Sequence, residues 1–305
     1  MSKKQIIYIT ILIVLIIVFF ITKINNNVEK RINFFQADSA KIRTIEISNI
    51  KDTLKFSKKN DEWILVYPIE NPVNKYQIEK IFTKVLQVKT SNLPISENES
   101  SFDTYKVNNS QGTRIKFLDE NNNILDEAII GKSSSPKTTP VRRPDENNIY
   151  QLEENINSMI TPNTDFWREK IILGIEKNNI SKISIICDIN AYELAPSDSL
   201  WHYTDGKSSL GVDLNNKTLR NIISTLSKLT VNGFVDNKFE DYKEKLSFPN
   251  LEIGIELFDG SSHYIRIAMD KDSKYVLQFD NEESYMYLVY NNWVEKFTKE
   301  AMDFK

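Results

Sequence analysis

The stretch EWILVYPIENPVNKYQIEKIFTKVLQ, residues 62–87, places a strand and a helix in one short piece of sequence. Residues 63–67 alternate in the pattern of a strand, and Pro68 marks its end. Asn74 then stands three residues before Gln77, which is the spacing of a helix cap. The apolar residues that follow recur at helical spacing: Ile78, Ile81, Phe82, Val85 and Leu86.

A second copy of this pattern lies in the other half of the chain. Trp201 and Tyr203 form a second tryptophan strand, and Asn215 is in place to cap a helix. We expect both tryptophans, Trp63 and Trp201, to pack in a core. The second apolar stripe superposes on the first with an offset of 141 residues, and its members are Leu219, Ile222, Ile223, Leu226 and Leu229.

The segments around these two stretches also repeat. The sequence FDTYK at 102–106 has a near copy, FEDYK, at 239–243, and Tyr150 corresponds to Tyr287. Alternating apolar residues predict further strands in both halves. In the first half they fall at 45–47, 54–56, 114–118, 128–130, near Val141 and at 149–152, and in the second half at 183–187 and 192–194.

The shared order predicts an α+β fold with two tandem repeats of one module. Each module is expected to be an antiparallel sheet packed by one helix, because two repeats are too few to share a solenoid core. We expect a first module at 41–161, a linker or seam at 162–178, and a second module at 179–305.

The N-terminus carries an apolar run that begins at Ile6 and ends at Thr22, between Lys4 and Lys23. As a helix it would span roughly 25 Å, close to the ~30 Å of a hydrocarbon core. A cleaved signal peptide is the alternative, but the run is long and no small residue pair follows it. We therefore expect a single transmembrane helix as an anchor within residues 1–23, followed by a juxtamembrane stalk at 24–40.

Charge and topology give the expected location. A very short N-terminal tail normally stays in the cytoplasm, so we expect an inner (cytoplasmic) membrane protein with a single pass and an extracytoplasmic C-terminal body. The formal charge of −3 argues against nucleic acid as a partner. The only cysteine, Cys187, excludes an internal disulfide and is expected to be a buried small hydrophobe.

The sequence contains no recognisable catalytic or metal-binding motif. Two histidines, His202 and His263, are too few for a histidine-rich metal site. Two pairs of adjacent acids, Asp126 with Glu127 and Glu282 with Glu283, lie among polar residues, so we interpret them as solvated surface rather than as a hydrolase pair. We expect no catalytic residue, no cofactor and no metal.

Two groups of residues are candidates for binding. The loop 131–148 holds Lys132, Lys137, Arg142 and Arg143, which could meet an anionic ligand or could be the ordinary charged residues of a hairpin loop, and we favour the second. Phe166, Trp167 and Arg168 form an aromatic and cationic group at the seam. Such a group can anchor a partner or lock two modules together, and we favour the lock.

The order of these features resembles a bacterial family of membrane-anchored proteins known as domain of unknown function 4340. The resemblance rests on WILVYP at 63–68, the helix from Asn74, IGK at 130–132, Tyr150 and DFWREKI at 165–171. It covers nearly everything after residue 23. After Tyr105 this chain has KVN where the family pattern has Gly-Leu and a proline, which loosens the match in the first module.

The resemblance implies a role beside ABC transporter components of the gliding-motility type, and it brings no catalytic residues. We therefore expect a non-enzymatic binding or scaffold protein that contacts the lipid bilayer and a membrane protein partner in a transporter assembly. One alternative is a hydrolase of envelope polysaccharide or peptidoglycan with a carboxylate pair in a cleft between modules. A receptor for a soluble ligand is a third possibility.

Overall fold

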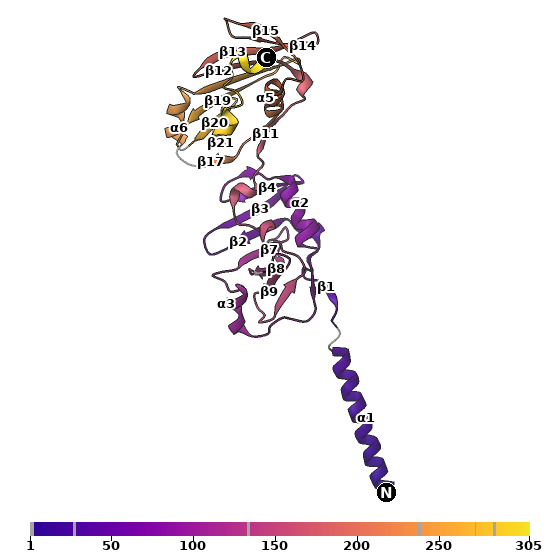
Figure 1. Ribbon diagram of the computed structural model, residues 1–305. Coiled ribbons are helices and arrows are strands. Elements are labelled where there is room, and N and C mark those ends of the chain that lie inside the picture. The colour runs from indigo at the N-terminus through magenta and orange to yellow at the C-terminus, as the bar shows by residue number, and fades with distance from the viewer. Residues whose placement is uncertain (1–2, 27–28, 133–134, 237–238, 272, 283–284) are drawn as a thin grey trace. The chain divides into compact units, whose positions relative to one another are not determined.

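The computed structural model divides the chain into two compact units, unit 1 at Met1–Arg168 and unit 2 at Glu169–Lys305 (Figure 1). Each unit contains one large sheet in which all paired strands are antiparallel, so the predicted α+β class is confirmed. The division falls within the predicted linker 162–178. The structure describes residues 3–26, 29–132, 135–236, 239–271, 273–282 and 285–305.

The N-terminal apolar run lies in helix α1, Lys3–Asn26. Its exposed apolar side chains include Tyr8, Leu12, Leu15 and Phe19. In the described part of the chain, no helix combines the length and the hydropathy that crossing a membrane requires.

The predicted stalk at 24–40 is partly wrong, because its second half belongs to unit 1. Strand β1, Arg31–Asn33, pairs with β6, Lys89–Ser91, at one edge of the sheet. Phe34 and Phe35 follow and are 6% and 3% exposed in the core. Two large aromatic side chains bury more apolar surface than an exposed stalk would allow, and they draw this segment onto the unit.

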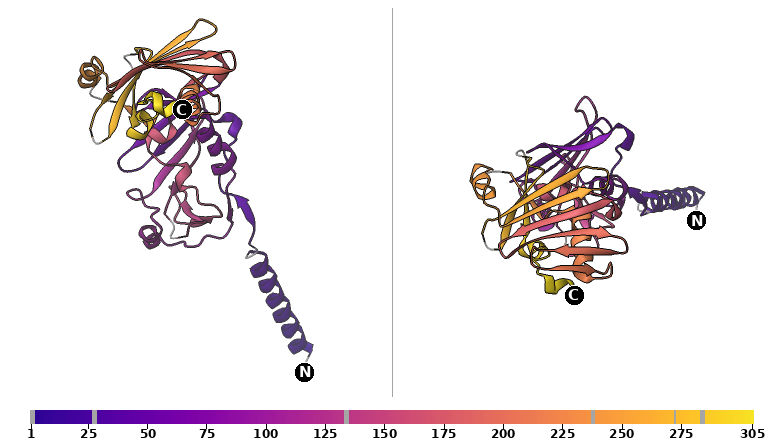
Figure 2. Two further views of the ribbon diagram at one scale, coloured as in Figure 1. Left: turned by 45° about the horizontal axis from the view of Figure 1, so that its top comes forward. Right: turned by 90° about the horizontal axis from the view of Figure 1, so that it is seen from above.

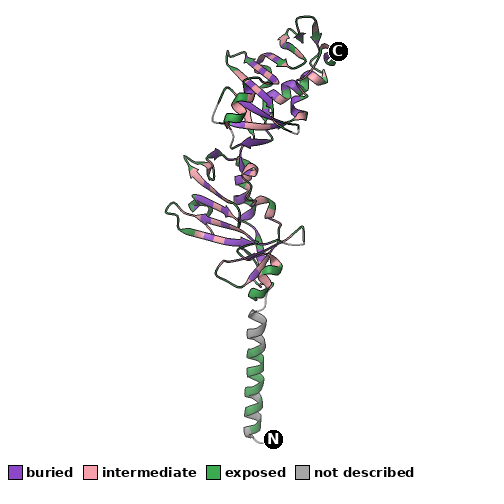
Figure 3. Ribbon diagram, turned by 90° about the vertical axis from the view of Figure 1, so that its left-hand side faces the viewer, coloured by how far each residue is buried: buried purple, intermediate pink, exposed green. Residues whose placement is uncertain are grey.

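The sheet of unit 1 has the order β1-β6-β10-β9-β8-β7-β2-β3-β4-β5. All of the strands predicted in this half are confirmed. In β2, β3 and β7 buried side chains alternate with more exposed ones, whereas all four residues of β9 are buried (Figure 3). The remaining bounds are β2 Thr44–Ser48, β3 Thr53–Lys59, β4 Glu62–Tyr67, β5 Asn71–Pro72, β7 Thr113–Leu118, β8 Ile124–Ile130, β9 Thr139–Arg142 and β10 Ile149–Leu152.

The helix that covers the main face of this sheet begins as predicted at Asn74, whose side chain accepts a hydrogen bond from the Gln77 amide. Helix α2 runs over Lys75–Lys80 and continues as a π-helical turn, η2, over Ile81–Val85. The Leu86 amide donates to the Ile81 carbonyl at 2.9 Å, five residues back. The predicted stripe lies on the core: Ile78, Ile81, Val85 and Leu86 are buried, and Phe82 packs against them partly buried.

The sheet of unit 2 has the order β15-β14-β13-β12-β18-β19-β20-β21-β17. Position by position this matches β5-β4-β3-β2-β7-β8-β9-β10-β6 of unit 1, so both units use the same strand order and the same connections. The bounds are β12 Ile180–Cys187, β13 Asn190–Ser197, β14 Leu200–Thr204, β15 Ser209–Val212, β17 Gly233–Val235, β18 Leu251–Leu257, β19 Ser262–Met269, β20 Lys274–Phe279 and β21 Met286–Tyr290.

Helix α5, Lys217–Ser227, corresponds to α2, but two details of its prediction are wrong. The cap is Asn216, whose Oδ1 accepts from the Leu219 amide at 3.0 Å, while the Asn215 amide donates to Asp213. Leu229 is buried in strand β16, Lys228–Thr230, which pairs with β11, Ile171–Gly174. The helix ends earlier because the chain turns into this two-stranded sheet.

Each sheet carries a helix on both faces, where the sequence predicted one. Helix α3, Phe102–Tyr105, and α6, Phe239–Leu246, place a Phe and a Tyr against small apolar clusters on the faces opposite α2 and α5 (Figures 1 and 2). In unit 2 this second cluster comprises Val235, Leu246, Ala268, Val276 and Met286. The repeated motifs at 102–106 and 239–243 are therefore packing elements.

Candidate functional site

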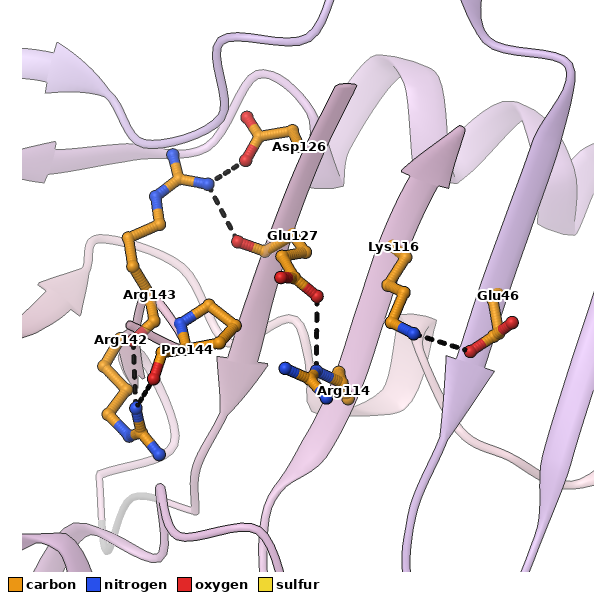
Figure 4. A network of polar contacts seen from close by, with 8 residues as sticks. All are labelled: Glu46, Arg114, Lys116, Asp126, Glu127, Arg142, Arg143 and Pro144. Atoms are coloured by element: carbon orange, nitrogen blue, oxygen red, sulfur yellow. Dashed lines mark hydrogen bonds and ion pairs between the residues drawn. The ribbon is translucent and has the colours of Figure 1, made fainter. Parts of the chain in front are cut away.

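In the basic loop predicted at 131–148, the two arginines contact other parts of unit 1 and the two lysines are exposed. Arg142 is the more buried of the arginines. Arg142 is 5% exposed on β9, and its Nε donates to the Val107 carbonyl at 2.8 Å. Its Nη1 donates to the carbonyl of Pro144 at 2.8 Å (Figure 4), and its guanidinium lies 4.2 Å from the Phe102 ring centroid. Burial lowers the pKa of Arg142 from its ordinary value. This side chain holds the loop and α3 together and is not open to an anionic ligand.

Arg143 is also engaged within unit 1. Its guanidinium forms an ion pair with Asp126 and donates to the Glu127 carbonyl at 2.8 Å (Figure 4). It also donates to the Phe34 carbonyl at 2.6 Å. The group also lies 4.4 Å from the Phe34 ring centroid. Burial is the main cause of a lowered pKa at Arg143. Both arginines are therefore engaged within unit 1, which disfavours an anionic ligand at their guanidinium groups, the less favoured of the two interpretations of this loop. Lys132 and Lys137 are exposed.

Asp126 and Glu127 do not lie in a solvated turn, which corrects the sequence interpretation. They are neighbours on β8, so their side chains point to opposite faces of the sheet. Asp126 is 8% exposed and also accepts from the Gln36 amide at 2.7 Å. Glu127 pairs with Arg114 at 3.3 Å on the other face. A further pair, Lys116 with Glu46 at 3.2 Å, joins the next strands (Figure 4).

The aromatic group at the seam belongs to the core of unit 1. Trp167 is fully buried, its ring lies 4.9 Å from that of Phe56, and its Nε1 donates to the Thr161 carbonyl at 2.7 Å. Phe166 packs edge-on against it at 5.1 Å. Arg168 is 2% exposed and lies 3.7 Å from Asp165. Trp167 is therefore buried within unit 1 and unavailable to a partner. The favoured expectation, that this group locks the two modules together, stays a prediction.

The remaining polar candidates do not come together. His202 is exposed on β14, and His263 contacts Asp280 through Nδ1 at 2.8 Å. Cys187 is half-buried rather than buried. Glu282 is exposed, and Glu283 lies outside the described residues. Within the described ranges, no three His, Cys, Asp or Glu side chains gather as a metal site would require.

A pocket of about 600 Å³ in unit 2 is a candidate for a binding site. Trp201, 5% exposed, lies on its wall together with Ile223 of α5. Three apolar side chains with large exposed fractions surround it, namely Leu200 at 38%, Leu214 at 52% and Phe258 at 66%. The other half of the lining is polar and includes Asn178, Ser199, Asn221 and Ser224, so the pocket combines apolar surface with polar groups that could orient a ligand.

The charged groups that line this pocket are Lys177, Arg220 and Asp198, so its balance is positive. Lys177 lies on the short helix η5, Lys177–Asn179, and Arg220 lies in the first turns of α5. Within the described chain, neither Arg220 nor Lys177 forms an ion pair. Both cations are therefore open to an acidic group of a ligand.

Local hydrogen bonds fix the segments that form the rim. The Phe258 amide donates to the Asn179 carbonyl at 2.8 Å, which ties the β18–β19 turn to η5. Asp213 accepts from the Asn215 amide at 2.6 Å and thereby shapes the loop that carries Leu214. These contacts arrange the apolar rim before any ligand arrives.

Unit 1 differs at the corresponding place. There the helix carries Phe82, whose ring lies 5.6 Å from that of Trp63, where unit 2 has the smaller Ile223 beside Trp201. Glu79 of unit 1 stands at the position of Arg220. The pocket is therefore a property of unit 2 and not a requirement of the fold.

The comparisons with known proteins place the chain in a family. Residues 63–249, more than half of the chain, match the family described as domain of unknown function (DUF4340). The chain belongs to the DUF4340 family. The DUF4340 match begins in β4 and ends before β18, so it includes both helix stripes and the α3 and α6 motifs. No curated protein and no solved structure matches the chain.

Sequence reasoning did not identify the pocket in this DUF4340 protein, although one signal was present. The offset of 141 residues aligns Glu79 with Arg220 and Phe82 with Ile223. The first pair reverses the charge, and the second replaces an aromatic ring by a smaller side chain. These two differences on one helix show where the surfaces of the two repeats diverge. The rim residue Phe258 gave no such signal, because its exposure depends on the turn that carries it.

Proposed function

We propose that the chain is a single-pass membrane-anchored, extracytoplasmic binding protein that docks a membrane protein partner through the pocket of unit 2. The observation that carries the proposal is the pocket between Trp201 and α5, with its apolar rim and two unpaired cations. The partner is proposed to belong to an ABC-transporter-type assembly in the inner membrane, as the family resemblance implies.

The chemistry of the pocket favours one kind of occupant, a protein segment with an apolar side chain next to an acidic one. Burying an apolar side chain against Trp201 and Ile223 contributes about 1.5–3 kcal/mol. Arg220 and Lys177 would each meet a carboxylate, and charge complementarity of this kind favours specific partners. Asp198 on the same wall disfavours a purely anionic ligand.

A membrane partner also fits the N-terminal run. The chain from Ile6 to Thr22 contains no charged residue, and the described side chains of this part of α1 are exposed. An exposed apolar helix needs an apolar environment, which a lipid bilayer supplies. The alternative, a carboxylate hydrolase, has less support because Asp126 and Glu127 are held by arginines within unit 1.

Photocross-linking in native membranes tests the docking surface. With a photoreactive phenylalanine at Phe258, we expect one dominant cross-link to a membrane protein, because this side chain stands at the rim of the pocket. The matched control is Phe248, which is also in unit 2 and is 86% exposed but does not line the pocket.

Two substitutions then connect the cross-link to the pocket. Ile223→Phe, which introduces the residue of unit 1, and Arg220→Glu should each reduce the yield by about tenfold or more, equivalent to about 1.4 kcal/mol. The control is Glu79→Arg, which reverses the charge at the exposed position of unit 1 that corresponds to Arg220. This variant should leave the cross-linking yield unchanged. Equal cross-linking at Phe248, or full cross-linking in Ile223→Phe, would contradict the docking proposal.

Membrane association is tested separately on the full chain. We expect the unaltered protein to remain in the membrane fraction after a wash at alkaline pH. We expect the double variant Ile13→Lys with Ile17→Lys to be released, because two charges in the apolar run oppose insertion. A reporter fused after Lys305 should be active only outside the cytoplasm. Release of the unaltered chain, or cytoplasmic activity of the reporter, would overturn the anchor or its orientation.

A further inference from the structure

Unit 1 also contains a hollow, of about 630 Å³, which has no role in the proposed function. Its charged residues are three lysines, Lys51, Lys106 and Lys132. Thr104, Ser110 and Gln111 add hydroxyl and amide groups, and Asn49 and Ile50 complete the lining. Lys51 and Lys132 are exposed, and Lys106 is half-buried.

Three segments of fixed backbone bring these lysines together. In the β2–β3 turn, Asn49 Oδ1 accepts from the amides of Lys51 and Asp52 at 2.8 and 2.7 Å. Lys106 ends α3 in the left-handed conformation with φ 58°, and its amide donates to the Phe102 carbonyl. The positions of two of the three lysines are therefore set by local hydrogen bonds.

The backbone at Lys132 is held in place because the preceding residue, Gly131, packs closely against α3. Its amide donates to the Tyr105 carbonyl at 3.2 Å, directly after Gly131. A Cβ at Gly131 would lie 2.1 Å from that same carbonyl, so only glycine lets the end of β8 pass this close to α3. The loop beyond α3 is held by Asn108 Oδ1, which accepts from the amides of Ser110 and Gln111 at 3.1 and 2.8 Å.

The charge of this hollow is uncompensated within the described part of the protein. No ion pair involves any of the three lysines among the described residues. Like charges that converge on one hollow repel each other, and a bound anion removes that cost.

Unit 2 has a hollow beside the equivalent helix and strand end, although the β12–β13 turn does not line it. The hollow between α6 and the end of β19 is lined by Asp241, Tyr242, Glu244, Lys245, Asp270 and Lys271. There Lys245 pairs with Asp270 at 2.9 Å, and the Tyr242 hydroxyl donates to the same carboxylate at 3.2 Å. The Lys245 hydrogen bond is the main cause of the lowered pKa of Asp270. Unit 2 thus supplies its own anion at a place where unit 1 supplies none.

We propose that the hollow formed by Lys51, Lys106 and Lys132 binds a phosphate group carried by a larger molecule. Lysines commonly bind phosphate, and they do so as point charges that need no fixed planar geometry. Three positive charges can neutralise the two negative charges of a phosphate monoester, or the closely spaced negative groups of a polyanion. The volume leaves room for the sugar or glycerol to which the phosphate is attached.

Titration calorimetry on the full chain in detergent tests this site with defined probes. The probes are inorganic phosphate, glycerol 1-phosphate, and the short-chain lipids dihexanoyl phosphatidylglycerol and dihexanoyl phosphatidylcholine below their micelle concentrations. We expect at least one anionic probe to bind. Similar binding of glycerol 1-phosphate and phosphatidylglycerol would assign the site to free phosphates, and binding of phosphatidylglycerol alone would assign it to a lipid headgroup.

Matched double variants show whether the binding belongs to the hollow. Lys51→Gln with Lys132→Gln should weaken the binding by about tenfold or more. Lys84→Gln with Lys137→Gln removes the same two charges from exposed positions of unit 1 outside the hollow, and binding should stay within about twofold. Equal losses in both double variants, or no binding of any anionic probe at millimolar concentration, would overturn the proposal.

Discussion

Replacing Arg143 by leucine is expected to lower the stability of unit 1 by up to about 3–5 kcal/mol, the cost of removing one partner from a buried ion pair, because Asp126 is buried although the Arg143 side chain is 23% exposed. Asp126 would remain with a side chain that is 5% exposed, and the Phe34 carbonyl would lose its donor. Because the chain has two units, hydrogen exchange of the β7 and β8 amides is the suitable measurement, since it reports the opening of unit 1 alone.

Two further variants show whether the charge is the cause. Lys137→Leu removes a charge from an exposed side chain in the same loop and should change stability by less than about 0.5 kcal/mol. Arg143→Leu combined with Asp126→Leu should recover part of the loss, because replacing a whole buried pair by apolar groups is often nearly neutral. A loss of less than about 1 kcal/mol in Arg143→Leu would show that solvent screens this pair.

Trp167→Ala is expected to cost about 3–5 kcal/mol, which is typical for truncating a fully buried aromatic residue. The indole packs against Phe56 and Phe166, and the alanine would leave a cavity beside both rings. Trp167→Phe keeps most of this packing and loses the hydrogen bond to the Thr161 carbonyl, so it should cost about 1 kcal/mol for the bond.

The comparison between these variants separates the core role that the structure gives Trp167 from partner anchoring, the less favoured of the two roles predicted from the sequence. A residue that anchors a partner would lose binding on truncation while the fold stayed stable, and hydrogen exchange in unit 1 would be unchanged. Tyr76→Ala, at an aromatic side chain that is 64% exposed, is the control for a surface position. If Trp167→Ala behaved like Tyr76→Ala, the core role would be wrong.

Local patterns predicted much of the fold. The strand predicted at 149–152 is β10 with its observed bounds, and Asn74 was identified as a cap because the residues that define a cap are close in sequence. The pair Asn215 and Asn216 could not be resolved in the same way, since both have the side chain of a cap and only the geometry of the turn selects one.

The site could be predicted much less well, because it depends on contacts between distant residues. Arg143 looks like a surface residue until its guanidinium is placed against the Phe34 carbonyl, 109 residues away in the sequence. Lys51 and Lys106 were not selected, since their proximity to Lys132 arises from three separate turns. Phe34 and Phe35 were assigned to a stalk because the strand beside them is only three residues long.

The exchange of Phe82 for Ile223 has a consequence for engineering this protein. A larger side chain at 223 should fill space beside Trp201 and stabilise unit 2, yet on the proposed function it would also close the docking pocket. Selection for heat resistance would therefore enrich aromatic residues at this position, and the selected variants would lose binding of the partner. Position 223 is a place where consensus between the two repeats is a poor guide to design.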